Sequence, residues 1–322
     1  MRNILYIVVP CYNEEAVLPE TSKRLLEKYK ELTEEKLISE ESRIVFVNDG
    51  SKDSTWEIIS RLHDENIIFS GINLSKNKGH QNAVMAGLMT VKDRCDIAIT
   101  LDADLQDDIN AIDEMVKKYH SGNDVVYGVR SSRKTDTFFK RFTAESFYKF
   151  MKIMGVDVVF NHADFRLMSN RVLDALSEYK EFNLFLRGII PQIGFKSDCV
   201  YYERHERFAG ESKYPLKKML SFAVDGITSF SVKPLKIIAN TGIIISALSI
   251  IAFFWVFIGH FVSNSATALG WPSIMCSIWF LGGLQIFFLG IIGEYIGKIY
   301  SEAKGRPRYV IQSELFDDND KI

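Results

Sequence analysis

Short apolar runs alternate with amphipathic stretches along the first 130 residues of the chain. The runs are rich in β-branched residues, and the stretches carry apolar residues at helical spacing, which is typical of βαβ units in a parallel sheet. We expect strands at residues 5–9, 44–47, 67–74, 97–101 and 125–127. We expect helices at residues 15–30, 55–64, 81–90 and 109–120. The pattern therefore predicts an α/β fold with one doubly wound domain.

The pattern is less regular after residue 130. It predicts a helix at residues 140–154, a short strand at 164–168 and another strand at 196–202. Residues 216–230 carry apolar side chains on one helical face and lysines on the opposite one. Because this segment comes directly before a long apolar stretch, we expect it to lie in a membrane interface with its lysines toward anionic lipid. An ordinary domain helix packed on the core would show the same pattern.

A long stretch near the end of the chain contains no charged residue. Between Ile237 and Gly293, 57 residues include no Asp, Glu, Lys or Arg. A polar break at residues 263–267 divides the stretch into two apolar parts, about 237–262 and 273–293. Each part has the roughly 20 residues that cross a bilayer as a helix. We therefore expect a two-helix transmembrane hairpin rather than a buried helix pair of a soluble protein.

Basic residues flank this hairpin but are absent from its connecting loop. By the positive-inside rule, both flanks are cytoplasmic. The first residues also lack the apolar region and cleavage site of a signal peptide. We expect a multi-pass protein of the plasma membrane, with its large first domain and both termini in the cytoplasm. Its expected parts are a cytosolic domain (1–214), an interfacial amphipathic helix (215–232), a transmembrane hairpin (233–297) and a cytosolic tail (298–322).

Composition excludes several classes of function. The cysteines at positions 11, 95, 199 and 276 show no Cys-x-x-Cys spacing, which favours small buried side chains in a reducing compartment. The six histidines form no metal-binding pattern, so we expect no structural zinc. A net charge of −2 gives no reason to expect a nucleic-acid partner.

Candidate chemistry begins with Asp102-Ala103-Asp104, directly after the apolar run at residues 97–101. The strand ends of open α/β sheets bind ligands. Two carboxylates one residue apart supply hard oxygen ligands for Mg²⁺ or Mn²⁺, which could hold a diphosphate. The pair therefore predicts nucleotide-sugar chemistry, although a bare Asp-x-Asp is also common in solvated loops.

Two further loops are expected at the same edge of the sheet. The first contains Pro10, Tyr12, Asn13 and Glu14, and the second contains Asp49. Their acidic and amide groups are suited to accept hydrogen bonds from ribose hydroxyls and a base. Taken alone, Asp49 followed by glycine is also an ordinary turn signal.

The ordered motifs of the chain resemble those of the inverting family 2 glycosyltransferases with a GT-A fold. They are Pro10-x-Tyr12-Asn13-Glu14, Asn48-Asp49-Gly50-Ser51, Lys78-Gly79-His80-Gln81 and Asp102-Ala103-Asp104-Leu105-Gln106. A narrower resemblance, to polyprenyl-phosphate glycosyltransferases such as bactoprenol-phosphate glucosyltransferases and dolichol-phosphate mannose synthases, is carried by later motifs. These are Ala163-Asp164-Phe165-Arg166-Leu167, the loop from Arg204 to Tyr214, and Gly293-Glu294-Tyr295-Ile296-Gly297 with the residues after it. Asn48 departs from the pattern, because many members carry a second Asp there.

The resemblance implies a GT-A (Rossmann-like) cytosolic domain and roles for individual residues. Asp102 and Asp104 would hold the metal, and the loops containing Pro10, Asp49 and Ala103 would bind the donor nucleotide. Asp104 and Asp164 are the expected catalytic residues, with Asp164 orienting the acceptor, the sugar or Arg166. A purely structural ion pair between Asp164 and Arg166 is the alternative. His80 and Gln81 would either approach the donor or cap a helix.

The expected acceptor is a lipid phosphate. Arg204, Arg207, Ser212 and Lys213 lie directly before the interfacial helix, and arginine forks suit phosphate oxygens. A generic polybasic patch on anionic lipid is the alternative. A phosphate monoester has a second pKa of about 6, so it is already largely ionised at neutral pH and needs no strong base.

The sequence thus predicts metal-dependent, inverting transfer of a hexose, glucose or N-acetylglucosamine, from a UDP-sugar to polyprenyl (undecaprenyl) phosphate for cell-envelope glycans. One alternative is a processive polysaccharide synthase, but none of the four Trp residues follows an Arg as in that class. Another is a non-enzymatic flippase or binding component. Glycines at 282, 283, 290 and 293 could pack helices of neighbouring copies, which favours a homo-oligomer.

Overall fold

The computed structural model describes residues 2–130, 162–181, 185–203, 228, 231–262 and 271–317. The chain divides into two compact units. Unit 1 comprises Met1–Lys149, Asp157–Tyr214 and Arg306–Ile322, and unit 2 comprises Phe150–Val156 and Pro215–Gly305. The helix expected at 140–154, most of the amphipathic helix expected at 215–232 and the polar break at 263–267 lie outside the described residues.

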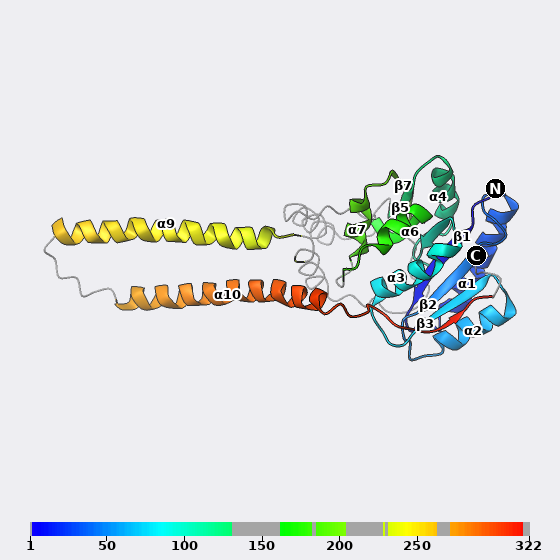
Figure 1. Cartoon of the computed structure of the whole chain (residues 1–322), viewed down its shortest axis with the longest axis horizontal. Helices are drawn as coiled ribbons and strands as arrows, with labels where there is room; N and C mark the ends of the chain where they lie inside the picture. Colours follow the sequence, from blue (N-terminus) through cyan, green and yellow to red (C-terminus); the bar gives the residue numbers. More distant parts are fainter. Residues whose placement is uncertain are drawn as a thin grey trace. The chain divides into compact units, whose positions relative to one another are not determined.

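Unit 1 is built around a sheet of eight strands, counted over the described ranges, in the order β7-β5-β6-β4-β1-β2-β3-β8. Figure 1 labels β1, β2, β3, β5 and β7 among the helices of this unit. The strands are β1 (Leu5–Cys11), β2 (Arg43–Asn48), β3 (Phe69–Leu74), β4 (Ile97–Thr100), β5 (Val125–Arg130), β6 (His162–Ser169), β7 (Ser197–Tyr202) and β8 (Ile311–Leu315). Every residue of β1 and β4 is buried. Their continuous apolar sequences are those of strands covered on both faces.

The sheet is mixed rather than parallel throughout. Strands β1, β2, β3 and β4 form a parallel block, as the sequence predicts. Strand β6 runs antiparallel to both of its neighbours, β4 and β5, and therefore separates two strands that point in the same direction. Strand β7 is parallel to β5. The five strands expected in the first 130 residues are all present. The last of these five, β5, pairs with the later strands β6 and β7 and not with β4.

Helices cover the sheet of unit 1. They are α1 (Leu18–Glu34), α2 (Thr55–Glu65), α3 (His80–Val91), α4 (Ala111–His120), α6 (Asn170–Ser177) and α7 (Leu186–Ile193). Helix α3 packs on β1 and β2, α2 packs on β3, and α4 packs on β5 and β7. The approach of α3 is close, because a Cβ at Gly87 would lie 2.4 Å from Val8 Cγ1 and 2.9 Å from Val47 Cγ2. Only glycine lets the helix lie this near the sheet.

The segment after the apolar hairpin returns to the sheet. Strand β8 pairs antiparallel with β3, with Gly71 opposite Leu315 and Leu74 opposite Ile311. The sequence of residues 298–322 predicts a cytosolic tail without a strand. Five residues with weak alternation (Ile311–Leu315) give little periodic signal, and their partner lies more than two hundred residues earlier. Pairing with β3 is what makes this segment a strand.

Unit 2 contains two long apolar helices, α9 (Lys233–Val262) and α10 (Trp271–Ala303), which contact each other. Helix α10 continues ten residues beyond the span expected to end at Gly293. Within the described part of the chain, Ser277–Ala303 has the length and composition of a membrane span, and none of its apolar window is buried. Large side chains such as Trp279 and Ile286 are 77% and 72% exposed. Exposure of this extent suits a lipid environment rather than water.

Candidate active site

The loops after β1 and β2 are bonded to each other. Asn13 has a left-handed backbone with φ of 54°, and its backbone N–H donates to the Ser51 hydroxyl oxygen at 3.0 Å. Its side-chain oxygen accepts the backbone N–H of Lys52 at 2.9 Å. The backbone N–H of Glu14 donates to Thr55 Oγ1 at 3.0 Å. These bonds hold the two sequence-predicted loops side by side at the carboxyl edge of the sheet.

Other predicted residues of the first loop differ in exposure. Pro10 is buried within β1, whereas Tyr12 is 36% exposed. In the second loop, Asn48 is buried and donates to Asn73 Oδ1 at 2.8 Å. Of these three residues, Tyr12 is therefore the one that a ligand could reach.

Asp49 holds the segment that leads into α3. Its two carboxylate oxygens accept the backbone N–H groups of Lys78 and Gly79 at 2.7 Å and 2.9 Å. Burial raises the pKa of Asp49, and these two hydrogen bonds oppose that rise. Gly50 has a φ of +61°, and a Cβ there would lie 2.5 Å from the backbone nitrogen of Asn77. The structure thus gives Asp49 a positioning role, and its expected contact with a nucleotide stays a prediction.

The Asp-x-Asp segment lies directly after β4 in a tightly bonded turn. The hydroxyl of Thr21 in α1 donates to the carbonyl of Ala103 at 2.8 Å. Leu105 adopts a left-handed φ of 57°, and the backbone N–H of Gln106 donates to Asp104 Oδ1 at 3.2 Å. The turn is therefore fixed between the two carboxylates and directly after them.

A cluster of opposite charges surrounds this turn. His80 is the first residue of α3, and its Nε2 lies 3.5 Å from Asp102 Oδ1 and 3.5 Å from Asp164 Oδ2. Arg187 donates two hydrogen bonds to Asp164, from Nε to Oδ1 at 3.1 Å and from Nη2 to Oδ2 at 3.0 Å. The buried Arg166 also donates to Asp164. We call His80, Asp102, Asp164, Arg166 and Arg187 the rim cluster.

The pKa values of two carboxyl groups in the rim cluster are shifted in opposite directions. Burial raises the pKa of Asp102, and the charges of Asp164, Asp107 and Asp104 add to that effect against the opposing charge of His80. Burial also favours the neutral form of Asp164, but Arg187, His80 and Arg166 hold its pKa well below the ordinary value. Asp164 is therefore a stable carboxylate that accepts hydrogen bonds, a poor general base, and an effective anchor for cations.

His80 lies between these two carboxylates. Desolvation lowers its pKa, but Asp102 and then Asp164 raise it more, so the imidazole favours its charged form. The side chain is 39% exposed, which leaves one side of the ring accessible. His80 does not cap the helix, because Gly79 occupies the N-cap position. Its expected approach to the donor stays a prediction.

Arg187 is the member of this site that sequence reasoning missed. It lies in the short helix α7, whose start is fixed by Gln81, because Gln81 Oε1 accepts the backbone N–H of Leu186 at 3.0 Å. The available signal was a single charged residue inside the apolar run from Leu184 to Ile190. Its partner Asp164 is 23 residues earlier in the chain, so spacing alone did not connect them.

The four residues expected to bind an acceptor phosphate, Arg204, Arg207, Ser212 and Lys213, lie outside the described residues. The Asp164–Arg166 ion pair expected as an alternative is present. It does not act alone, because His80 and Arg187 share the same carboxylate.

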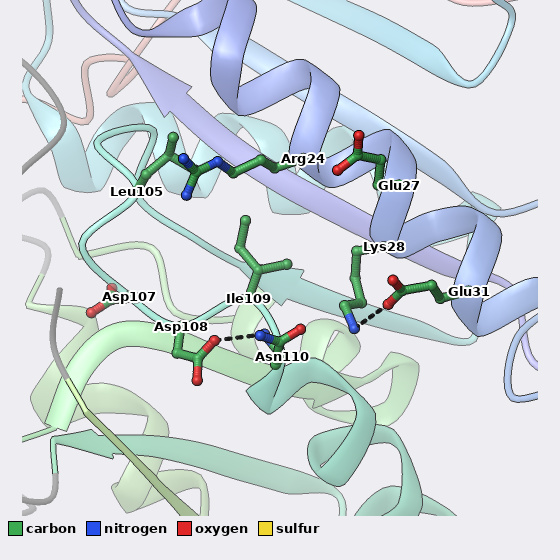
Figure 2. A pocket seen from close by; sticks show the side chains of 9 residues that line it. All are labelled: Arg24, Glu27, Lys28, Glu31, Leu105, Asp107, Asp108, Ile109 and Asn110. Carbon is green, nitrogen blue, oxygen red and sulfur yellow. Dashed lines mark hydrogen bonds and ion pairs between the residues drawn. The ribbon is translucent and has the colours of Figure 1, made fainter.

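A pocket of about 220 Å³ lies between α1 and the loop that follows the carboxylate pair (Figure 2). Lys28 of this pocket is paired: its Nζ lies 2.5 Å from Oε2 of Glu31, which also lines the pocket, and 3.3 Å from Oδ2 of Asp113, which does not. Nearby, Arg24 Nε lies 2.7 Å from Glu20 Oε1. We call these five residues the seam cluster. Two of its pairs lie within α1 and the third joins α1 to α4, so we assign the cluster to holding these two helices together.

Two models of protein families match separate stretches of the chain. Residues 6–177 match the model described as "Glycosyl transferase family 2". Residues 233–299 match the model described as "GtrB C-terminal hairpin". The first match contains every element that supplies the carboxylate pair and His80, and the second contains α9 and nearly all of α10.

Individual relatives align along almost the whole chain. A Bacillus subtilis protein named "Uncharacterized glycosyltransferase YkoT" is 55% identical over 315 residues, covering 98% of this chain and 93% of its own. The bactoprenol glucosyl transferase of Shigella phage SfX is 41% identical over 308 residues, covering 95% and 98%. A solved mannosyltransferase from Pyrobaculum calidifontis, in complex with GDP-Man and Mn²⁺, is 13% identical with a TM-score of 0.49, covering 92% and 88%.

Proposed function

The chain belongs to glycosyl transferase family 2, and we propose that it transfers a hexose from a UDP-sugar to a polyprenyl phosphate at the cytoplasmic face of the membrane. One observation carries this proposal. Bactoprenol glucosyl transferases align with it across 95–96% of its length, through the site loops and both apolar helices. A relation of this extent supports glucose as the first sugar to test, with N-acetylglucosamine second.

The carboxylate pair suits a divalent cation. Asp104, Asp107 and Asp164 place three negative charges near Asp102, which His80 opposes on one side. Mg²⁺ in enzymes commonly takes one or two carboxylates together with substrate phosphates and waters. We propose that Asp102 and Asp104 hold Mg²⁺ or Mn²⁺, which would neutralise the charge developing on a departing diphosphate.

Asp164 and its partners would serve the transferred group. Because Arg187 and Arg166 stabilise the carboxylate, Asp164 is suited to orient hydroxyls or cations rather than to remove a proton. The attacking phosphate needs no proton removed, since its second pKa is about 6. His80 would donate a hydrogen bond toward the donor from its exposed side. Arg204 and Arg207, with Ser212 and Lys213, would bind the acceptor phosphate.

The connectivity of the sheet supports an even number of membrane crossings. Strand β7 precedes α9 and β8 follows α10, yet both strands belong to the sheet of unit 1. A chain that leaves this sheet and returns to it must emerge on the side from which it entered. We therefore propose that α9 and α10 both cross the membrane, with the lysine- and arginine-bearing flanks in the cytoplasm.

Purified full-length protein in detergent, incubated with undecaprenyl phosphate, Mn²⁺ and a radiolabelled sugar nucleotide, tests the proposal. We expect label in the organic extract with UDP-glucose or UDP-N-acetylglucosamine. Undecaprenol, which lacks the phosphate, and the Asp104→Asn variant serve as controls that should give none. If label reached undecaprenol equally well, the acceptor assignment would be wrong. Release of free sugar alone would overturn the transfer assignment.

A further inference from the structure

The residues after the hairpin are bound to unit 1 at three places. We call Arg308–Phe316 the C-terminal strap. The guanidinium of Arg308 donates to the carbonyl of Tyr179. At the other end, the ring of Phe316 lies 4.3 Å from the guanidinium of Arg94. Between these ends, β8 pairs with β3. The strap is therefore an integral edge of the catalytic sheet.

Side-chain packing holds β8 in register. A Cβ at Gly71 would lie 3.2 Å from Leu315 Cδ1 and 2.8 Å from Ile59 Cγ2. Leu315 thus packs over a glycine of β3 and joins the hydrophobic core. Gln312 and Glu314 alternate with it and face solvent.

The strap also fixes the start of the segment that delivers His80. The backbone N–H of Ser75 donates to the Val310 carbonyl at 2.9 Å. The segment runs from Ser75 to His80. Near its other end, the carboxylate of Asp49 accepts the backbone N–H groups of Lys78 and Gly79. Most of the segment is exposed. The segment is therefore held by the strap at its start and by Asp49 near its end, in addition to the close packing of Asn77 on Gly50 and of α3 on β1 and β2.

We propose that the C-terminal strap is a positioning element for the reaction: by holding Ser75 it places His80 between Asp102 and Asp164. This inference rests on the proposed function. Its physical basis is that the two attachments bracket the segment, so releasing one lets His80 leave its 3.5 Å contacts. Displacement of a positioned group by about 1 Å can cost on the order of 10²-fold in rate.

Truncation tests the proposal. A chain that ends after Tyr309 loses β8, whereas a chain that ends after Phe316 keeps the whole strap and serves as the matched control. We expect the shorter chain to lose at least tenfold in kcat with little change in the KM of the donor. The control should keep the full rate. A synthetic peptide of residues 308–316 should restore part of the lost rate, and a scrambled peptide should not.

Hydrogen exchange separates this proposal from the proposed function, because it needs no turnover. Amides of residues 75–80 should exchange faster in the shorter chain, while those of β5 and β6 keep their protection. Leu315→Asp in the full-length chain should have the same effect, with Glu314→Ala as its exposed control. Unchanged exchange at residues 75–80, or full kcat in the shorter chain, would show that the C-terminal strap does not position His80. If exchange at residues 75–80 responded as expected but the protein transferred no sugar, only the proposed function would be wrong.

Discussion

Two clusters of charged residues lie near the Asp-x-Asp turn, and they are built differently. In the seam cluster, Lys28 is buried but its partners Glu31 and Asp113 have side chains 60% and 32% exposed. In the rim cluster, Asp164 and Arg166 have side chains only 15% and 2% exposed. The seam pairs each charge with a nearby opposite one, whereas the rim gathers three cationic side chains around one carboxylate.

The difference separates structure from chemistry. In the seam cluster, desolvation of Lys28 is outweighed by Glu31 and Asp113, so its pKa rises and it remains a simple cation. In the rim cluster, neighbouring carboxyl groups have pKa values shifted in opposite directions. Divergent shifts between neighbouring acids are typical of sites with distinct chemical roles. Mutations should therefore affect catalysis at the rim and stability at the seam.

The largest effect is expected for Asp104→Asn, beside the rim cluster. An amide lacks the charge that holds a hard cation, so transfer should fall by roughly 10²-fold or more. Thermal unfolding should change little. Asp108→Asn is the matched control, because it alters a carboxylate of the same loop outside the pair. An Asp104→Asn enzyme with metal-independent, full turnover would remove the distinction between rim and seam.

Arg187→Ala should have the second largest effect. It removes a two-donor contact to Asp164, which should raise the pKa of that carboxylate and lower kcat by about 10- to 100-fold. Arg187→Lys should recover only part of the rate, because an ammonium cannot reproduce the planar fork. Equal rates for the Lys and Ala variants would show that the fork geometry is irrelevant. Steady-state kinetics with saturating donor measures the effect.

Lys28→Met should act on stability and not on catalysis. The substitution keeps the apolar stem but leaves Glu31 and Asp113 without their cation, at a cost of about 1 kcal/mol. For a domain of this size, that should lower the thermal midpoint by roughly 2–4 °C. The kcat should remain at the wild-type value. A large loss of kcat with an unchanged midpoint would place Lys28 in the catalytic site.

Arg24→Ala should have the smallest effect. Arg24 and Glu20 form an i,i+4 pair on α1 with side chains 47% and 30% exposed. Exposed pairs of this kind contribute about 0.5 kcal/mol or less. Neither the thermal midpoint nor the kcat should change measurably. If Arg24→Ala lowered the thermal midpoint more than Lys28→Met does, the exposure of a charged side chain would not predict its contribution to stability.

The sequence predicted the parallel block and the Asp-x-Asp turn because both depend on local pattern. Buried strands such as β1 are continuous apolar runs, and Asp102 follows one of them directly. The insertion of β6 between β4 and β5 was not predicted, since strand order depends on pairing between distant segments. Arg187 was missed for the same reason, because only tertiary contact brings α7 to Asp164. Local pattern does not encode such contacts.

Strand β8 also determines the order in which the protein can mature. Translation delivers β3 long before β8, and the apolar hairpin is synthesised between them. Until then, β3 presents an unpaired edge, which is a template for aggregation. Closing a contact over more than two hundred residues is also slow. Under the topology proposed above, insertion of the hairpin precedes protection of this edge. A nascent chain stalled before insertion would then leave the unpaired edge of β3 accessible to chaperones and proteases.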